Sequence, residues 1–376
     1  MENKTLKTLF EIHKELSLFG RYIHSQNIAP LLDKLKDKMR VIEVGASVNG
    51  LPIHSITFGS GEKKILMWSQ MHGNESTTTK AVFDMLNIFL EENHEMEHIL
   101  ASCSICIIPI LNPDGAELYT RLNANKIDLN RDAQDLSQPE SIVLRKVFED
   151  FAPDFCYNLH GQRTIFSAGN TNKSATVSFL SPSQNPERTI TTTRKKAMEV
   201  ISVMNVNLQQ HIENQVGIYD DIFNVNCVGD AFQASNVPTM LFEAGHYAND
   251  YYRERTREFI FQSLIVSLDY IASHTITGDY CGAYFNIPQN EKRFYDIIIR
   301  NVKGGDVALQ YFESLVDSVL VFVPKIERIS DLSGFFGHKE IDANGSGAFG
   351  ESYATLKVGD EIDFVMINDE KFSFKV

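Results

Sequence analysis

The chain has 376 residues, of which 43% are hydrophobic and 22% charged, as in an ordinary globular protein. Its formal net charge is -14 and no Lys/Arg cluster stands out, which argues against nucleic acid or an anionic membrane as the main partner. The N-terminus does not resemble a signal peptide, and no apolar run approaches the roughly 20 residues that span a bilayer. Five cysteines, an odd number, favour a reduced protein, so we expect a cytoplasmic location.

The first elements follow from the spacing of apolar residues. Helical spacing over about 5–38 predicts a helix, and two alternating runs around Asn49 and Gly50 predict a hairpin. Apolar runs further along the chain predict buried strands at 64–69, 104–110, 155–159 and 238–242. Helices are predicted at 76–90, 138–150, 186–213 and 253–273. We expect a turn at 112–115 and an irregular active-site loop region at 214–236.

This alternation of strands and helices predicts an α/β fold with a doubly wound sheet flanked by helices. Such sheets bind ligands at the carboxyl ends of their strands. After about residue 280 the pattern changes to short strand-like runs separated by Gly-containing turns, which predicts a small all-β module. We therefore expect two domains, a catalytic domain at 1–278 and the β module at 279–376.

Three predicted strands end at a residue that can bind a metal or carry a proton. His72 follows the strand at 64–69 with Glu75 three residues later, and His160 ends the strand at 155–159. Two imidazoles and one carboxylate suit zinc, and three protein ligands leave a fourth position open, as in catalytic zinc sites. A surface His–Glu pair and a core histidine are the alternatives. Asp128 is the candidate partner for the spare nitrogen of a ligand histidine.

The third such strand, at 238–242, ends at Glu243 in a hydrophobic environment. Burying an ionised group there costs free energy, so such a group is expected only where it has a function or an ion-pair partner. It is the candidate general base, with a structural salt bridge as the alternative. Asn130 and Arg131 together suit a carboxylate clamp, and Arg121 suits an oxyanion, although single arginines often form surface ion pairs.

The order His-x-x-Glu, Asn-Pro-Asp-Gly, Arg-x-Asn, Asp-Leu-Asn-Arg, His and strand-borne Glu resembles the M14 zinc carboxypeptidases over roughly residues 40–275. The resemblance implies a mixed sheet and one zinc ion on the two histidines and the glutamate named above. It also implies Glu243 as the base and Arg121 at the scissile carbonyl. Asn130 with Arg131 is implied to hold the terminal carboxylate of the substrate.

The resemblance extends to the substrate pocket. Tyr219 is nearest in placement to the tyrosine with which that family caps its substrate. Gly229 is expected near the base of the side-chain pocket, where it offers no fixed charge. Asp230 and Asp221 are close enough in sequence to change that expectation.

The leading interpretation is a zinc-dependent metallocarboxypeptidase. It would hydrolyse the C-terminal amide bond of a peptide or cell-wall-type peptide, with water activated by zinc and Glu243. An alternative is a zinc-dependent deacylase of N-acyl amino acids, similar to aspartoacylase and succinylglutamate desuccinylase, where an extra β domain restricts access. A non-catalytic peptide- or glycan-binding module is the third interpretation. The first two predict a substrate with a free carboxylate.

Overall fold

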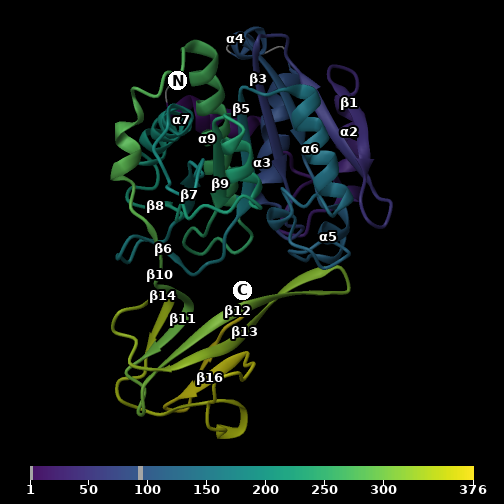
Figure 1. Ribbon diagram of the computed structural model, residues 1–376. Helices are drawn as coiled ribbons and strands as arrows, with labels where there is room; N and C mark the ends of the chain where they lie inside the picture. Colours follow the sequence, from purple (N-terminus) through teal and green to yellow (C-terminus); the bar gives the residue numbers. More distant parts are fainter. Residues whose placement is uncertain (1–2, 92–95) are drawn as a thin grey trace.

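A computed structural model describes residues 3–91 and 96–376 and places an eight-stranded mixed sheet inside a large N-terminal unit (Figure 1). The strand order is β1-β2-β4-β3-β5-β9-β7-β8. The bounds are β1 Arg40–Ala46, β2 Pro52–Phe58, β3 Lys63–Ser69, β4 Cys103–Ile108, β5 Phe155–Gly161, β7 Val177–Leu180, β8 Val216–Ile218 and β9 Thr239–Ala244. Strands β4, β3, β5 and β9 are parallel neighbours, and β1, β2 and β7 add antiparallel pairings. The predicted fold class is confirmed.

Helices cover both faces of this sheet, as a doubly wound arrangement requires. The helices α6 and α8 pack on one face, against a buried cluster that includes Trp68 and Phe232, whereas α3, α7 and α9 pack on the other. The helix bounds are α1 Asn3–His13, α2 Ser25–Leu35, α3 Thr77–Leu90, α4 Glu97–Ser102, α5 Pro113–Leu118, α6 Pro139–Phe151, α7 Thr192–Leu208, α8 Val228–Ala234 and α9 Glu254–Ser273. None of the helices in the described ranges is long and apolar enough to cross a membrane.

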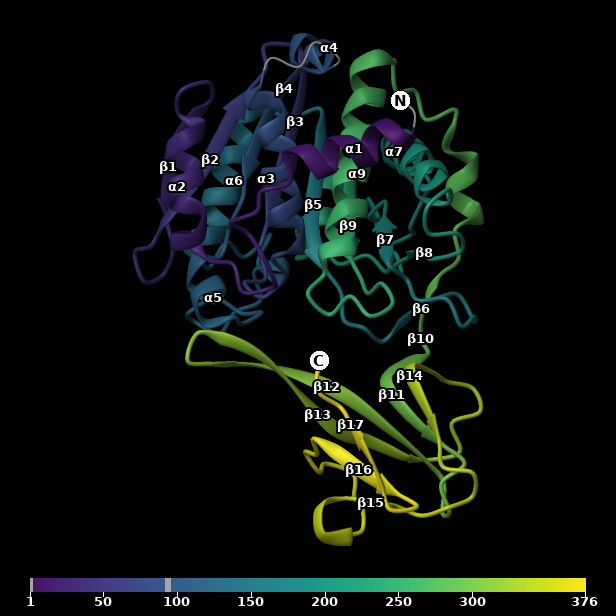
Figure 2. The ribbon, with the colours of Figure 1, turned by 180° about the vertical axis from the view of Figure 1, so that it is seen from behind.

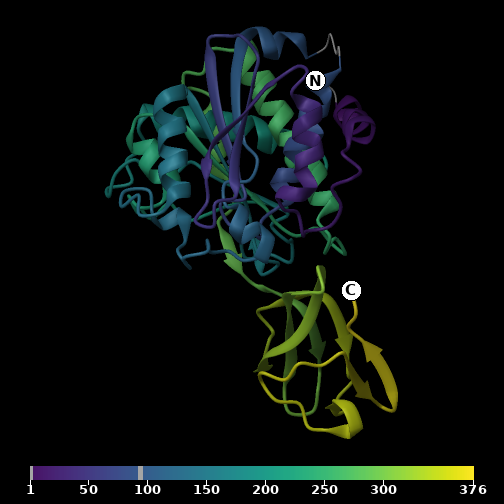
Figure 3. The ribbon, with the colours of Figure 1, turned by 90° about the vertical axis from the view of Figure 1, so that its right-hand side faces the viewer.

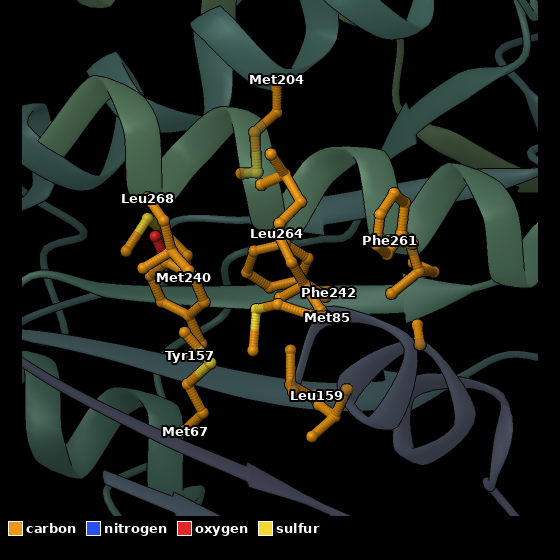
Figure 4. Close-up of a cluster of buried hydrophobic side chains, with 14 of the residues drawn as sticks. Met67, Met85, Tyr157, Leu159, Met204, Met240, Phe242, Phe261, Leu264 and Leu268 are labelled. Atoms are coloured by element: carbon orange, nitrogen blue, oxygen red, sulfur yellow. The ribbon is translucent and has the colours of Figure 1, made fainter. Parts of the chain in front are cut away.

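The larger core lies between the central strands and the helices α3, α7 and α9 (Figure 4). Met67, Tyr157 and Phe242 from three neighbouring strands are fully buried there, and Met85 and Leu264 face them from α3 and α9. Parallel strands covered on both faces read as nearly continuous apolar runs, which is why the sequence pattern located them. Each such side chain contributes about 1.5–3 kcal/mol on burial. The result is a rigid platform for the residues at the strand ends.

The predicted helix over 5–38 is wrong in its middle, because α1 ends at His13 and α2 begins at Ser25. The intervening segment is held by Arg257, whose guanidinium donates to the carbonyls of Leu18 at 2.5 Å and Glu15 at 2.8 Å. That arginine is fully buried and also pairs with Asp84. A tertiary contact therefore overrides the local helical pattern.

Three other local predictions need correction. The segment 112–115 starts a short helix, α5, because the Asn112 side chain accepts a hydrogen bond from Gly115 N at 2.8 Å as an N-cap. The helix predicted over 186–213 is shorter, since the Thr191 side chain caps α7 and the helix ends at Leu208. The region 214–236 is less irregular than expected, because it contains β8 and α8.

The C-terminal part of the chain is all-β, as predicted, and lies beside the N-terminal unit (Figures 2 and 3). One sheet has the order β13-β12-β11-β14 and a second has the order β15-β16-β17. The bounds are β11 Phe294–Arg300, β12 Asp306–Val316, β13 Val319–Ser330, β14 Phe336–Asp342, β15 Ala348–Phe349, β16 Phe364–Ile367 and β17 Glu370–Ser373. Asp317 and Ser318 both have positive φ, as a two-residue hairpin turn requires, so β12 and β13 form one long hairpin. This hairpin extends beneath α5 (Figure 1).

The two parts are joined by a segment that still belongs to the larger core. Cys281, Tyr284 and Ile287 are buried in that core, and β10 (Asn290–Lys292) pairs with β6 (Phe166–Ala168) of the N-terminal unit. The change to the all-β sheets comes after Lys292 in the structure. The domain boundary at 278/279 stays a prediction.

Candidate metal centre and substrate cleft

His72, Glu75 and His160 come together at the carboxyl ends of β3 and β5. His72 Nδ1 lies 2.9 Å from Glu75 Oε1, and His160 Nδ1 lies 3.0 Å from Glu75 Oε2 and 3.1 Å from His72 Nδ1. All three potential ligand atoms lie within 4.8 Å of one another, and both histidines are buried. No second group of this kind occurs in residues 3–91 and 96–376.

This arrangement fits a zinc ion. Bonds of 2.0–2.1 Å at tetrahedral angles space neighbouring ligand atoms about 3.3 Å apart, close to the separations found here. Burial opposes ionisation of Glu75, but the two histidines hold its pKa well below the ordinary value, so it is the anion that a metal requires. Two imidazole nitrogens facing each other at 3.1 Å cannot both donate, which also suits a shared cation.

The turn that carries His72 is shaped by the Asn-Pro-Asp-Gly segment. A Cβ on Gly73 would lie 1.9 Å from the backbone of Gly115, so these two backbone segments approach more closely than any residue other than glycine permits. The Asn112 side chain donates to Met71 O at 3.2 Å. The segment expected to be a turn therefore packs against and supports the turn that carries the candidate ligand His72.

Asp128 lies on the far side of His72, where its Oδ1 is 3.1 Å from Nε2. A carboxylate at that position fixes the tautomer in which Nδ1 is free to bind a metal. Arg121 is exposed and donates to Asp128 Oδ2 from Nε and Nη2, and to Glu75 Oε1 from Nη1 at 3.3 Å. The guanidinium is thus held at the edge of the candidate ligand set.

Glu243 occupies the position of β9 that is paired in register with His160 of β5. Its Oε2 is buried without a hydrogen-bond partner in the described part of the chain. Burial raises the pKa of the Glu243 carboxyl well above its ordinary value, and the Glu75 charge raises it further. A divalent cation on the neighbouring ligands would lower this pKa again.

Asn130 and Arg131 lie across the same cavity. Asn130 Oδ1 accepts from Val228 N at 3.0 Å, which caps α8 and leaves the Nδ2 group as a donor. Arg131 is exposed, and its Nη1 donates to Asn130 O at 2.6 Å and to Cys227 Sγ at 3.0 Å. Its remaining donors are free for a ligand, since no carboxylate of the described residues pairs with it.

The cavity has a volume of about 400 Å³ and is lined by the three candidate metal ligands, by Glu243 and the candidate substrate contacts, and by Tyr219 and Gly229. Tyr219 is half-buried and its ring meets Phe166 edge-on at 5.3 Å. Asp230 also lines the cavity, and burial raises its pKa to about 6. Asp221 does not, because it pairs with Arg194 at 2.8 Å.

Several cleft residues were not singled out from the sequence. They include Gln162, Arg163, Phe166, Leu180, Ile222 and Leu241. Gln162 and Arg163 follow His160 directly, so the strand-end argument extended by three residues would have found them. The apolar members carry no local signal that separates them from core residues.

The sequence profile of zinc carboxypeptidases matches residues 26–222, which is more than half of the chain. The chain belongs to this family. The predicted resemblance to the M14 zinc carboxypeptidases is confirmed. The members of this family are metallopeptidases, which are hydrolases.

Individual relatives match over shorter stretches. Carboxypeptidase E of Caenorhabditis elegans is 30% identical over 151 residues, which is 33% of this chain and 32% of that protein. Carboxypeptidase SOL1 of Arabidopsis thaliana is 28% identical over 142 residues, 32% of this chain and 29% of that protein. The chain thus spans about a third of the length of these relatives.

Solved structures agree on the fold. A metallo-carboxypeptidase from Burkholderia cenocepacia superposes with a TM-score of 0.52 at 17% identity, covering 65% of this chain and 69% of that chain. Carboxypeptidase A from Helicoverpa armigera gives 0.51 at 16% identity, covering 72% and 80%. At such identities the likeness concerns the fold alone.

Proposed function

We propose that the protein is a zinc-dependent metallocarboxypeptidase that removes the C-terminal residue of a peptide or cell-wall-type peptide. One observation carries the proposal. The candidate ligands His72, Glu75 and His160, the unpartnered carboxylate of Glu243 and the Asn130–Arg131 pair all line one cavity. The family profile supports the same reaction class.

The residues divide the chemistry among them. Zinc, when held by the three ligands, polarises the scissile carbonyl and acidifies water. Glu243 accepts the proton of the attacking water and returns it to the leaving amine, which needs a carboxylate with a free oxygen at the site. Arg121 Nη1, held at the edge of the ligand set, donates to the oxygen that gains charge.

Exopeptidase selectivity would come from the other end of the cavity. Arg131 has donors to spare and Asn130 presents its amide, so together they bind a terminal carboxylate and set the distance to the scissile amide. Tyr219, which lines the cavity, would cover the bound residue, and Leu180, Ile222 and Leu241 would provide an apolar surface for the side chain of that residue.

The test is to incubate the protein with short free-carboxylate peptides, cell-wall-type peptides and N-acyl amino acids, with and without a chelator. Products are read by mass spectrometry. Chelator-sensitive loss of single C-terminal residues is the expected result. Cleavage of acyl amino acids alone would favour the deacylase interpretation over the peptidase. Stoichiometric zinc without hydrolysis of any amide would favour the interpretation as a non-catalytic binding module.

A further inference from the structure

A second cavity, of about 530 Å³, adjoins the first cavity and has no role in the function proposed above. The two cavities share five lining residues, Glu75, Arg121, Gly161, Gln162 and Arg163. Asn130 and Arg131 line the first cavity only. A substrate with its terminal carboxylate on that pair must pass Glu75 to continue, so the second cavity lies on the acyl side of the scissile amide.

The far wall of this cavity is supplied by the C-terminal module. Tyr311, Phe312 and Glu313 of β12 and Glu327 of β13 line it. The hairpin is held to the N-terminal unit because Glu313 pairs with Arg21 and accepts from Tyr119 OH at 2.6 Å. The module therefore encloses the acyl side of the cleft.

The charges lining this cavity do not cancel within the protein. Arg21 is neutralised by Glu313, and Arg121 by Asp128 and Glu75. Arg163 is exposed and forms no hydrogen bond or ion pair with any other residue in the described ranges.

Arg253 is the second cation that forms no ion pair. Only 2% of its surface is exposed, it donates to two backbone carbonyls, and no carboxylate of the described chain pairs with it directly. Burial, together with the Arg21 charge, lowers the pKa of Arg253 to about 10, and the charges of Glu313 and Asp250 offset this only in part. The lining of the cavity contains one carboxylate that is not paired, the exposed Glu327, compared with these two guanidiniums. The cavity is thus built for an anionic group.

We propose that Arg163 is a specificity-determining residue that binds a carboxylate on the acyl side of the scissile amide, inside the cavity closed by the β12–β13 hairpin. The inference rests on the proposed hydrolysis of a C-terminal amide. The carboxylate is supplied either by an acidic side chain of the penultimate residue or by a dicarboxylic acyl group. Arg163 makes the direct contact, and the buried Arg253 strengthens the positive field.

The test compares acetyl-Glu-Phe with acetyl-Gln-Phe, and N-succinyl-Phe with N-butyryl-Phe, so that each pair differs at the acyl-side carboxylate. We expect kcat/KM to favour the acidic member of at least one pair by about tenfold, the strength of a charge-assisted hydrogen bond. The pair that discriminates identifies the source of the carboxylate. Arg163→Gln should reduce the ratio to about one, and Arg163→Glu should shift preference toward acetyl-Lys-Phe.

Arg40→Gln is the matched control, since Arg40 is an exposed arginine on β1 that lines neither cavity, and it should keep the wild-type ratios. Equal kcat/KM within both pairs, or a ratio that survives Arg163→Gln, overturns the proposal while leaving the carboxypeptidase intact.

A binding measurement separates failure of this site from failure of the reaction. Calorimetry with zinc-loaded Glu243→Gln protein compares the affinities for acetyl-Glu-Phe and acetyl-Gln-Phe without turnover. The Glu243→Gln protein should bind acetyl-Glu-Phe more tightly than acetyl-Gln-Phe, and the double variant with Arg163→Gln should bind both equally. This result supports the site even if no substrate is hydrolysed. Equal affinities refute it.

Discussion

The candidate metal-binding edge of the large sheet and the C-terminal module form the walls of two adjoining cavities in different ways. At the sheet edge, His160 and Glu243 lie at the ends of β5 and β9, and His72 follows β3. These residues come together because the parallel strands end at the same edge. In the module, Glu313 and Glu327 sit on a hairpin whose own pattern is ordinary β structure. The difference teaches that reactive groups can be located from local sequence, whereas the wall that limits a cavity depends on how separate parts pack.

The two regions also satisfy their buried polar groups differently. The candidate metal-binding edge leaves the buried carboxylate oxygen Glu243 Oε2 without a partner, as expected where a ligand completes the site. At the junction with the module, the buried carboxylate of Asp296 accepts from Tyr251 OH at 3.1 Å, from Tyr311 N at 2.8 Å and from Gln310. The carboxylate at the junction is thus satisfied by the protein itself, although Gln310 Oε1 and both ring nitrogens of His246 nearby are buried without a partner.

The largest expected effect comes from removing the candidate general base at the sheet edge. Glu243→Gln keeps the shape of the side chain but cannot accept a proton, so kcat should fall by roughly a thousandfold. Zinc content, measured by elemental analysis, should stay at the wild-type level because Glu243 is not among the clustered ligands. Glu370→Gln, an exposed change on β17, is the matched control. Retention of full activity would remove Glu243 from the base role.

A second prediction concerns the carboxylate end of the cleft. Arg131→Gln should lower kcat/KM for free-carboxylate peptides by about a hundredfold, since the charge-assisted hydrogen bonds are lost. Peptides with a C-terminal amide should be affected much less, and the wild-type preference for the free acid should disappear. If the preference persists in the variant, another residue holds the terminal carboxylate.

A smaller effect is expected one contact away from the metal. Asp128→Asn should weaken zinc binding about ten- to a hundredfold, because the amide no longer anchors the His72 tautomer. Competition with a metal buffer measures the change, and Asp37→Asn on the surface serves as the control. Unchanged affinity would mean that Asp128 acts on Arg121 alone.

The smallest effect concerns Asp296 at the junction with the module and is measured as a change in the free energy of unfolding. Burial raises the pKa of Asp296 to about 6 from the ordinary 3.8, so wild-type stability falls as pH rises from about 3.8 to 6 and stays lower above. That penalty is at most about 3 kcal/mol. Asp296→Asn should be more stable than wild type by about 1 kcal/mol at pH 8, after the loss of charge-assisted hydrogen bonds, and lose this advantage at pH 3.5.

Urea unfolding at both pH values checks this prediction, with Asp317→Asn in the exposed hairpin turn as the control. The same difference from wild type at both pH values would show that the titration of Asp296 is not linked to folding.

Much of the fold was predictable because the central strands are buried on both faces and appear as apolar runs. His72, Glu75 and His160 could be expected to meet for the same reason. The break between α1 and α2 could not, because it depends on Arg257, more than 200 residues away in sequence. Nor could the second cavity, since Arg163 and Glu327, which line it, come from different units and neither belongs to a recognisable motif.

The position of the hairpin in the chain has a consequence for synthesis. Glu243, the last of the candidate catalytic residues, precedes Tyr311, the first hairpin residue of the cavity wall, by nearly seventy residues. At 5–20 residues per second, roughly 3 to 14 seconds pass between their translation. A nascent chain therefore has the candidate catalytic residues before it has this wall, so the selectivity proposed above would be acquired after the groups proposed for catalysis.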